Sequence, residues 1–122
     1  MASVYELDHK GKTIVCLDIA GLQSRDKPVF YKLVAQAEEK IRQYSPKSAF
    51  VITNVTNTGF DTEISGIIKE YAQHNTPYVR ASAVVGISGW QKVILIAVKT
   101  VTGRDFHLAN TMEEAKEWLV KQ

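Results

Sequence analysis

The stretch YVRASAVVGISGWQKVILIAVKTVTG, residues 78–103, decides the fold of this chain. Turn residues bound its first part and predict a strand over 78–85. A turn with two glycines follows. Apolar residues at helical spacing then predict a helix over about 88–101, which Gly103 ends. A strand that leads directly into a helix is the repeating unit of a parallel α/β sheet.

The rest of the chain follows the same pattern. Strands are expected over 3–8, 12–19, 48–53 and 105–108. Helices are expected between Asp26 and Pro46, from Asp61 to about residue 74, and over 111–122, with N-caps at Asp26, Asp61, Ser88 and Thr111. The first two strands are joined by the turn residues HKG and form an antiparallel hairpin. The ββαβαβαβα order predicts an α/β fold: a mixed, mostly parallel five-stranded sheet with four helices.

Composition sets limits on the function. The chain has 122 residues, which fits one domain over residues 1–122, with 45% hydrophobic and 23% charged residues. A net charge of +2, with acids and bases interleaved, gives no support for nucleic-acid binding. The lone Cys16 lies inside a strand and is expected to be buried and unreactive. No signal-peptide pattern or membrane-length apolar run is visible, so a cytoplasmic, non-transmembrane protein is expected.

The two glycines after the strand resemble a phosphate-binding loop only superficially. A Walker loop needs four residues between its glycines and then Lys-Ser/Thr, whereas Gly86 and Gly89 are three apart and Lys92 is followed by valine. The favoured interpretation is a tight turn in which Gly86 leaves the sheet and Ser88 caps the helix. The alternative is a weak anion site formed by Ser88, Gly89 and Lys92 at the helix start.

A second polar loop, NVTNTGFD, follows the strand over 48–53. The carboxyl ends of parallel strands meet at one edge of the sheet, so this loop should lie beside the loops over 20–26 and 86–90. Asn54, Asn57, Thr58 and Asp61 could line a small pocket there. The alternative is that they form the turn and cap the next helix.

The helix over 88–101 is apolar nearly all round, which indicates burial on more than one side. The expected core face comprises Trp90, Val93, Ile94, Ala97 and Val101. Lys92 and Lys99 mark the opposite face, with Ile96 between them and Leu95 at a border. Trp90, Leu95 and Ile96 are therefore candidates for an apolar pocket or an interface, and a second subunit is favoured as the cover.

Catalytic and metal-binding patterns were sought and none is found in the sequence. His9, His74 and His107 are scattered and show no metal-ligand spacing. There is no Gly-x-Ser-x-Gly elbow, and Ser88 has no histidine or acid suitably placed. We therefore expect no enzymatic activity, no cofactor and no metal.

Several segments together resemble a known family. GKTIVCLDIAGL, ITNVTNTGFDTEI, ASAVVGISGWQKVILIAV and FHLANTMEEAKEWL are similar to the SpoIIAA-like domains, bacterial relatives of the STAS domains. The resemblance covers essentially the whole chain. It implies the fold of the anti-sigma-factor antagonists, which is grouped with the CRAL-TRIO lipid-carrier fold. Most members of this branch have no established activity.

The resemblance also bears on phosphorylation. Anti-sigma-factor antagonists carry an acid and two hydroxyl residues where the mid-chain helix begins, and a kinase phosphorylates the second hydroxyl. Asp61 and Thr62 match the acid and the first hydroxyl, but Glu63 stands at the phosphorylated position. A carboxylate cannot take up phosphate as serine does, so Thr62 is the remaining candidate.

The sequence leaves two candidate functions. The first is a non-catalytic regulatory or protein-interaction module, as a homodimer or with another protein partner. The second is a carrier or sensor of a small apolar or anionic lipid-like ligand, lodged beside the helix over 88–101.

Overall fold

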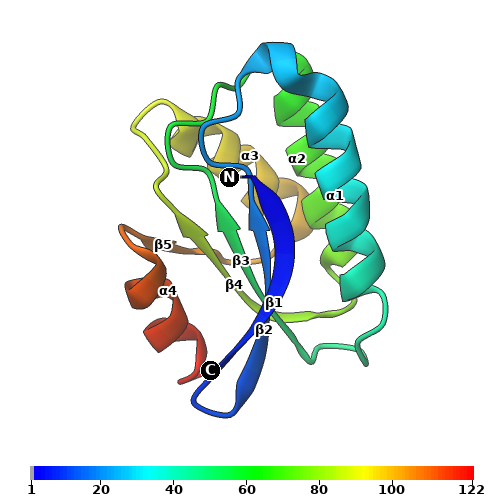
Figure 1. Ribbon diagram of the computed structural model, residues 1–122, viewed down its shortest axis with the longest axis vertical. Helices are drawn as coiled ribbons and strands as arrows, with labels where there is room; N and C mark the ends of the chain where they lie inside the picture. The colour runs from blue at the N-terminus through cyan, green and yellow to red at the C-terminus, as the bar shows by residue number, and fades with distance from the viewer. Residues whose placement is uncertain (1) are drawn as a thin grey trace.

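The computed structural model describes residues 2–122 as one five-stranded sheet flanked by helices (Figure 1). Its strands are β1 (Ser3–His9), β2 (Lys12–Asp18), β3 (Ala49–Asn54), β4 (Val79–Val85) and β5 (His107–Ala109). Its helices are α1 (Lys27–Ile41), α2 (Thr62–Asn75), α3 (Gln91–Thr102) and α4 (Met112–Leu119), with a short 3₁₀ turn, η1 (Ser24–Asp26), before α1.

The strands lie in chain order, β1-β2-β3-β4-β5. β1 and β2 are antiparallel, and every later pairing is parallel. This arrangement confirms the predicted mixed, mostly parallel sheet and places β1 at an edge. All four parallel strands therefore end at the same edge of the sheet, where their loops meet.

Alternate side chains of the central strands feed two separate cores. Val15, Leu17 and Val51 point to the face that carries α1, α2 and α3. Cys16 and Ile52 point to the opposite face, which α4 covers. Strands that are apolar on both sides are typical of a sheet buried between two layers.

Two of the predicted N-caps are correct. Asp61 Oδ1 accepts a hydrogen bond from Ile64 N at 2.8 Å, and Thr111 Oγ1 accepts one from Glu114 N at 3.1 Å. A third, Asp26, stands at the N-cap position of α1 as predicted, but its side chain makes no cap bond and instead accepts from Gln23 N. The fourth is wrong. α3 begins at Gln91, three residues later than expected, and its N-cap, Trp90, makes no side-chain cap bond, so Ser88 is not the cap.

Cys16 is buried between β1 and β3, as predicted. Burial raises the pKa of its thiol to about 11, so the thiol is protonated at neutral pH. No helix within residues 2–122 combines the length and the apolar character needed to cross a bilayer.

Candidate functional site

The three loops at the carboxyl edge of the sheet do meet. Gly21 N donates to Thr56 O at 3.0 Å, and Gly59 N donates to Leu22 O at 2.8 Å. Gly86 has a φ of 78°, and a Cβ there would lie 2.8 Å from Thr56 Cα. Only glycine accepts both this backbone angle and this close approach. The expected meeting of the loops is therefore confirmed, and Gly86 makes the turn.

The side chain of Gln91 joins this edge to α3. It is almost fully buried: its Oε1 accepts from Ser88 N at 2.9 Å and its Nε2 donates to Thr58 O at 2.8 Å. A buried glutamine with both ends hydrogen-bonded fixes the start of the helix without a serine cap. Sequence reasoning missed this residue because glutamine is not a usual capping residue.

Most polar side chains of the NVTNTGFD loop are engaged within the protein. Asn54 Oδ1 accepts from Thr56 N and from Thr56 Oγ1, and the buried Thr58 Oγ1 donates to Ile19 O at 2.9 Å. Asn57 is exposed and has a φ of 53°. These bonds are the ones expected of turn-forming residues.

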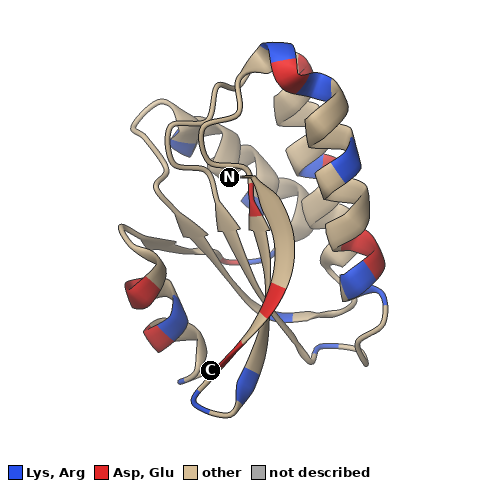
Figure 2. Ribbon diagram, in the orientation of Figure 1, with Lys and Arg blue, Asp and Glu red and all other residues tan. Residues whose placement is uncertain are grey.

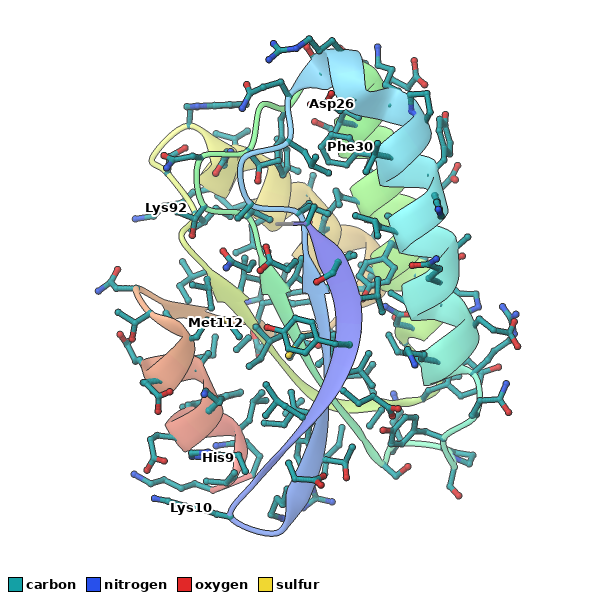
Figure 3. All side chains as sticks on the ribbon, in the orientation of Figure 1. His9, Lys10, Asp26, Phe30, Lys92 and Met112 are labelled. Carbon is teal, nitrogen blue, oxygen red and sulfur yellow. The ribbon has the colours of Figure 1, made fainter. Side chains whose placement is uncertain are left out.

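The candidate anion loop likewise has little free polarity. The Ser88 amide is taken by Gln91, and Ser88, Gly89 and Lys92 are all exposed. Lys92 points outward from the start of α3 (Figure 3). The anion site therefore stays a prediction.

An ion-pair cluster surrounds the start of α2. Lys27 Nζ lies 2.9 Å from Asp61 Oδ2 and 3.4 Å from Glu63 Oε1. The hydrogen bond from Ile64 N, and next the one from Lys27, lower the pKa of Asp61. Thr62 is exposed beside these acids, and its phosphorylation stays a prediction that mass spectrometry after incubation with lysate and ATP can test.

The predicted core face of α3 is wrong. Val98 and Gln91 are its buried residues, with Ile94 and Leu95 partly buried on the same side. Four large apolar side chains on and beside α3 are exposed, and we call this group the outer α3 patch: Trp90 (56%), Val93 (68%), Ile96 (65%) and Val101 (45%). Figure 2 shows α3 almost without charge, whereas α1 and α4 carry bands of both signs. Ile96 is exposed as an interface candidate should be, but Leu95 faces inward.

A cavity of about 50 Å³ lies beneath α3, between α2, α3 and the sheet. Its wall is mainly apolar. The lining residues are Val51, Thr53, Val55, Phe60, Ile68, Tyr71, Ala72, Asn75, Ser82, Val84, Ile87, Gln91, Ile94, Leu95, Val98, Arg104 and Phe106. Trp90 meets Phe60 edge to face, with ring centroids 6.1 Å apart, so one aromatic pair joins the outer patch to the cavity wall.

Two polar groups of the cavity wall were not identified from the sequence. Tyr71 counted only as part of the apolar stripe of α2, yet its buried hydroxyl has no hydrogen-bond partner among residues 2–122. Arg104 lies in the loop after α3 and crosses the end of the cavity to reach Ser82 Oγ at 3.0 Å. No local pattern marks Arg104, because its partners are remote in sequence, and the burial of the Tyr71 hydroxyl depends on how α2 packs.

Comparisons with known proteins bear on the fold. No protein-family profile matches the chain, and no curated protein matches it in sequence. Among solved structures, it matches an uncharacterized protein from the DUF3478 family with a SpoIIAA-like fold, from Shewanella loihica PV-4. The TM-score is 0.72 at 11% identity, over 96% of this chain and 92% of that chain. The fold is SpoIIAA-like. At this identity the likeness confirms the fold expected from the sequence and leaves the function open.

Proposed function

We propose that this chain is a non-catalytic regulatory or interaction module of STAS-like type, which binds a protein surface through the outer α3 patch. The observation that carries the proposal is the row of four large, exposed apolar side chains on and beside one helix. Contiguous exposed apolar surface of this kind typically marks a site of protein contact.

A second copy of the chain is the first partner to test. A twofold axis would bring each patch against its own copy, and such self-complementary contacts are the commonest in homo-oligomers. Lys92 and Lys99 flank the patch, and Lys99 Nζ already pairs with Asp105 Oδ1 at 2.7 Å within the chain. This ion pair lowers the repulsion between the lysines of the two copies that a dimer would bring together.

Ile96→Asp tests this proposal. A carboxylate within the patch would be desolvated by any apolar cover, so we expect wild type to be a dimer by multi-angle light scattering and the variant to be a monomer. Val29→Asp is the matched control. Val29 is 40% exposed but lies on α1, so its variant should remain a dimer.

The result can count against the proposal in two ways. If wild type and Ile96→Asp have the same oligomeric state and the same thermal melting curve, the patch is not covered by a second copy. If Val29→Asp dissociates as fully as Ile96→Asp, the effect is not specific to α3.

The second candidate function is the carrier or sensor of a small ligand. The cavity beneath α3 favours it, because a mainly apolar lining with a few polar groups is typical of small-molecule sites. Native mass spectrometry of freshly purified protein tests it: a co-purifying small molecule supports the carrier function, and its absence favours the interaction module.

A further inference from the structure

We propose that the cavity beneath α3 binds a small apolar carboxylic acid as its anion, with Tyr71 and Arg104 holding the carboxylate. The inference deepens the carrier function and rests on it. It names the chemical class of the ligand and the two residues that would recognise it.

The apolar part of the ligand is set by the cavity wall. Val51, Val84, Ile94, Leu95 and Val98 come from β3, β4 and α3 and surround the space with branched aliphatic groups. These aliphatic groups favour a hydrocarbon chain over a sugar or a nucleotide base, which would need many hydrogen-bond partners.

The first recognition group is the Tyr71 hydroxyl. Tyr71 is only 4% exposed, lines the cavity, and has no hydrogen-bond partner for its Oη among residues 2–122. Thr53 and Asn75 are close enough to influence this oxygen, but neither makes a hydrogen bond of acceptable geometry with it. Leaving a buried hydroxyl unpaired costs about 1–3 kcal/mol, so such a group calls for a function. An acceptor atom inside the cavity would satisfy it.

The second recognition group is the Arg104 guanidinium. It donates to Thr76 Oγ1 at 3.1 Å, to Ser82 Oγ at 3.0 Å and to the carbonyl of Ala72, next to Tyr71, at 3.0 Å. Its carbon lies 4.8 Å from the centroid of the Phe106 ring. All of these partners are neutral. A guanidinium has five N–H donors, so donors remain for a further acceptor.

Arg104 also lacks an anionic partner within the chain. No carboxylate of residues 2–122 lies within ion-pair distance of it, although eight ion pairs occur elsewhere. A partly buried cation is normally paired, because burial weakens its solvation. A ligand carboxylate would complete the pair at the polar end of the cavity.

The charges select a monoanion over other polar head groups. One cation and one neutral hydroxyl match the single charge and two oxygens of a carboxylate. A dianionic phosphate would bring a second buried charge without a partner. An ammonium group would be repelled by Arg104, and a neutral alcohol would leave its charge uncompensated.

The size of the cavity limits the ligand and requires α3 to move. About 50 Å³ is smaller than the roughly 150 Å³ of an engineered cavity that binds benzene. Gln91 and Val98 are the buried residues of α3, while Ile94 and Leu95 are only partly buried, so a ligand would have to displace these partly buried side chains at the middle of the helix. We therefore expect a short-chain acid rather than a long fatty acid.

Hexanoate and hexan-1-ol are the matched probes, followed by two-dimensional ¹H–¹⁵N NMR of the full chain. Hexanoate should shift amide signals of α2 and α3 and bind at least about tenfold more tightly than hexan-1-ol, because an ionised hydrogen-bond partner is stronger than a neutral one. Arg104→Gln should abolish this preference. Tyr71→Phe, which removes only the unpaired hydroxyl and should fold at least as stably as wild type, should weaken hexanoate about tenfold.

The outcomes separate the inference from the function on which it rests. Equal binding of both probes, or unchanged hexanoate affinity in the folded Tyr71→Phe variant, overturns the carboxylate assignment but leaves a carrier of neutral apolar molecules. If neither probe shifts the signals of α2 and α3, both the assignment and the carrier function fall.

Discussion

α3 and α4 lie on opposite faces of the same sheet and are held in different ways. α4 has eight residues, and its Ala115 and Leu119 are completely buried against the sheet. α3 has twelve residues and is far richer in apolar side chains, yet most of its large residues are exposed or only partly buried. The shorter and more polar helix is therefore the better packed of the two.

Polar contacts add to this difference. Glu117 of α4 bonds to His9 Nε2 at 2.5 Å and to Lys10 Nζ at 2.6 Å, which ties the helix to the β1–β2 turn (Figure 3). His107 and Trp118 stack with their ring centroids 4.5 Å apart. α3 has its main anchor at one end, through Gln91, and covers a cavity at its middle. The apolar content of a helix therefore does not measure how fully it is buried.

The largest expected difference comes from truncating one apolar side chain on each helix. Leu119→Ala should lower the free energy of unfolding by about 2–5 kcal/mol, because it leaves a hole in a closed core. Ile96→Ala should change the free energy of unfolding of the monomeric chain by less than about 0.5 kcal/mol, because Ile96 faces outward within one chain. Urea denaturation measures both. Equal losses would show that α3 is as well packed as α4.

Gly86→Ala tests how α3 is launched from the sheet. A side chain there must adopt a φ of 78° and would press against the backbone of Thr56, so we expect a loss of stability of about 2 kcal/mol or more. Gly89→Ala is the control. A Cβ at that position would meet no atom within 4 Å, and its φ does not lie in the left-handed region that favours glycine. Thermal unfolding compares them; a Gly86→Ala variant as stable as Gly89→Ala would contradict the tight turn.

The smallest expected effect concerns the acid that anchors α4. The bonds from Lys10, and next from His9, lower the pKa of Glu117 from an ordinary 4.5 to about 2. A lowered pKa means that this stabilisation is complete above pH 4.5 and is lost as the pH falls toward 2. Glu117→Gln should therefore melt slightly below wild type at pH 6, and most of this difference in melting temperature should be gone at pH 2.

Lys10→Gln supplies the control for the pH experiment. This variant removes the larger of the two causes that lower the pKa of Glu117. The loss of stability between pH 6 and pH 2 should therefore be smaller than in wild type, but still present. A gap between wild type and Glu117→Gln that stays constant across this range would show that the anchor does not depend on the carboxylate charge.

The order of strands and helices could be read from local patterns. β2 and β3 are apolar on both faces, which predicted central strands, and the loops at their carboxyl ends were expected to meet. Asp61 and Thr111 were recognisable as caps because their bonds reach only three residues ahead. Each of these features depends on neighbours in the sequence.

The facing of α3 and the groups inside its cavity were not predictable in the same way. With apolar residues nearly all round a helix, periodicity cannot indicate which side meets the sheet, and the expected face was wrong. Arg104 reaches acceptors 22 and 32 residues away in sequence, at Ser82 and Ala72. The sequence by itself determined the α/β order, the sheet and the turn at Gly86. Only the tertiary structure decided which side of α3 is exposed and brought Arg104 to Tyr71, because both depend on contacts between segments that are remote in the chain.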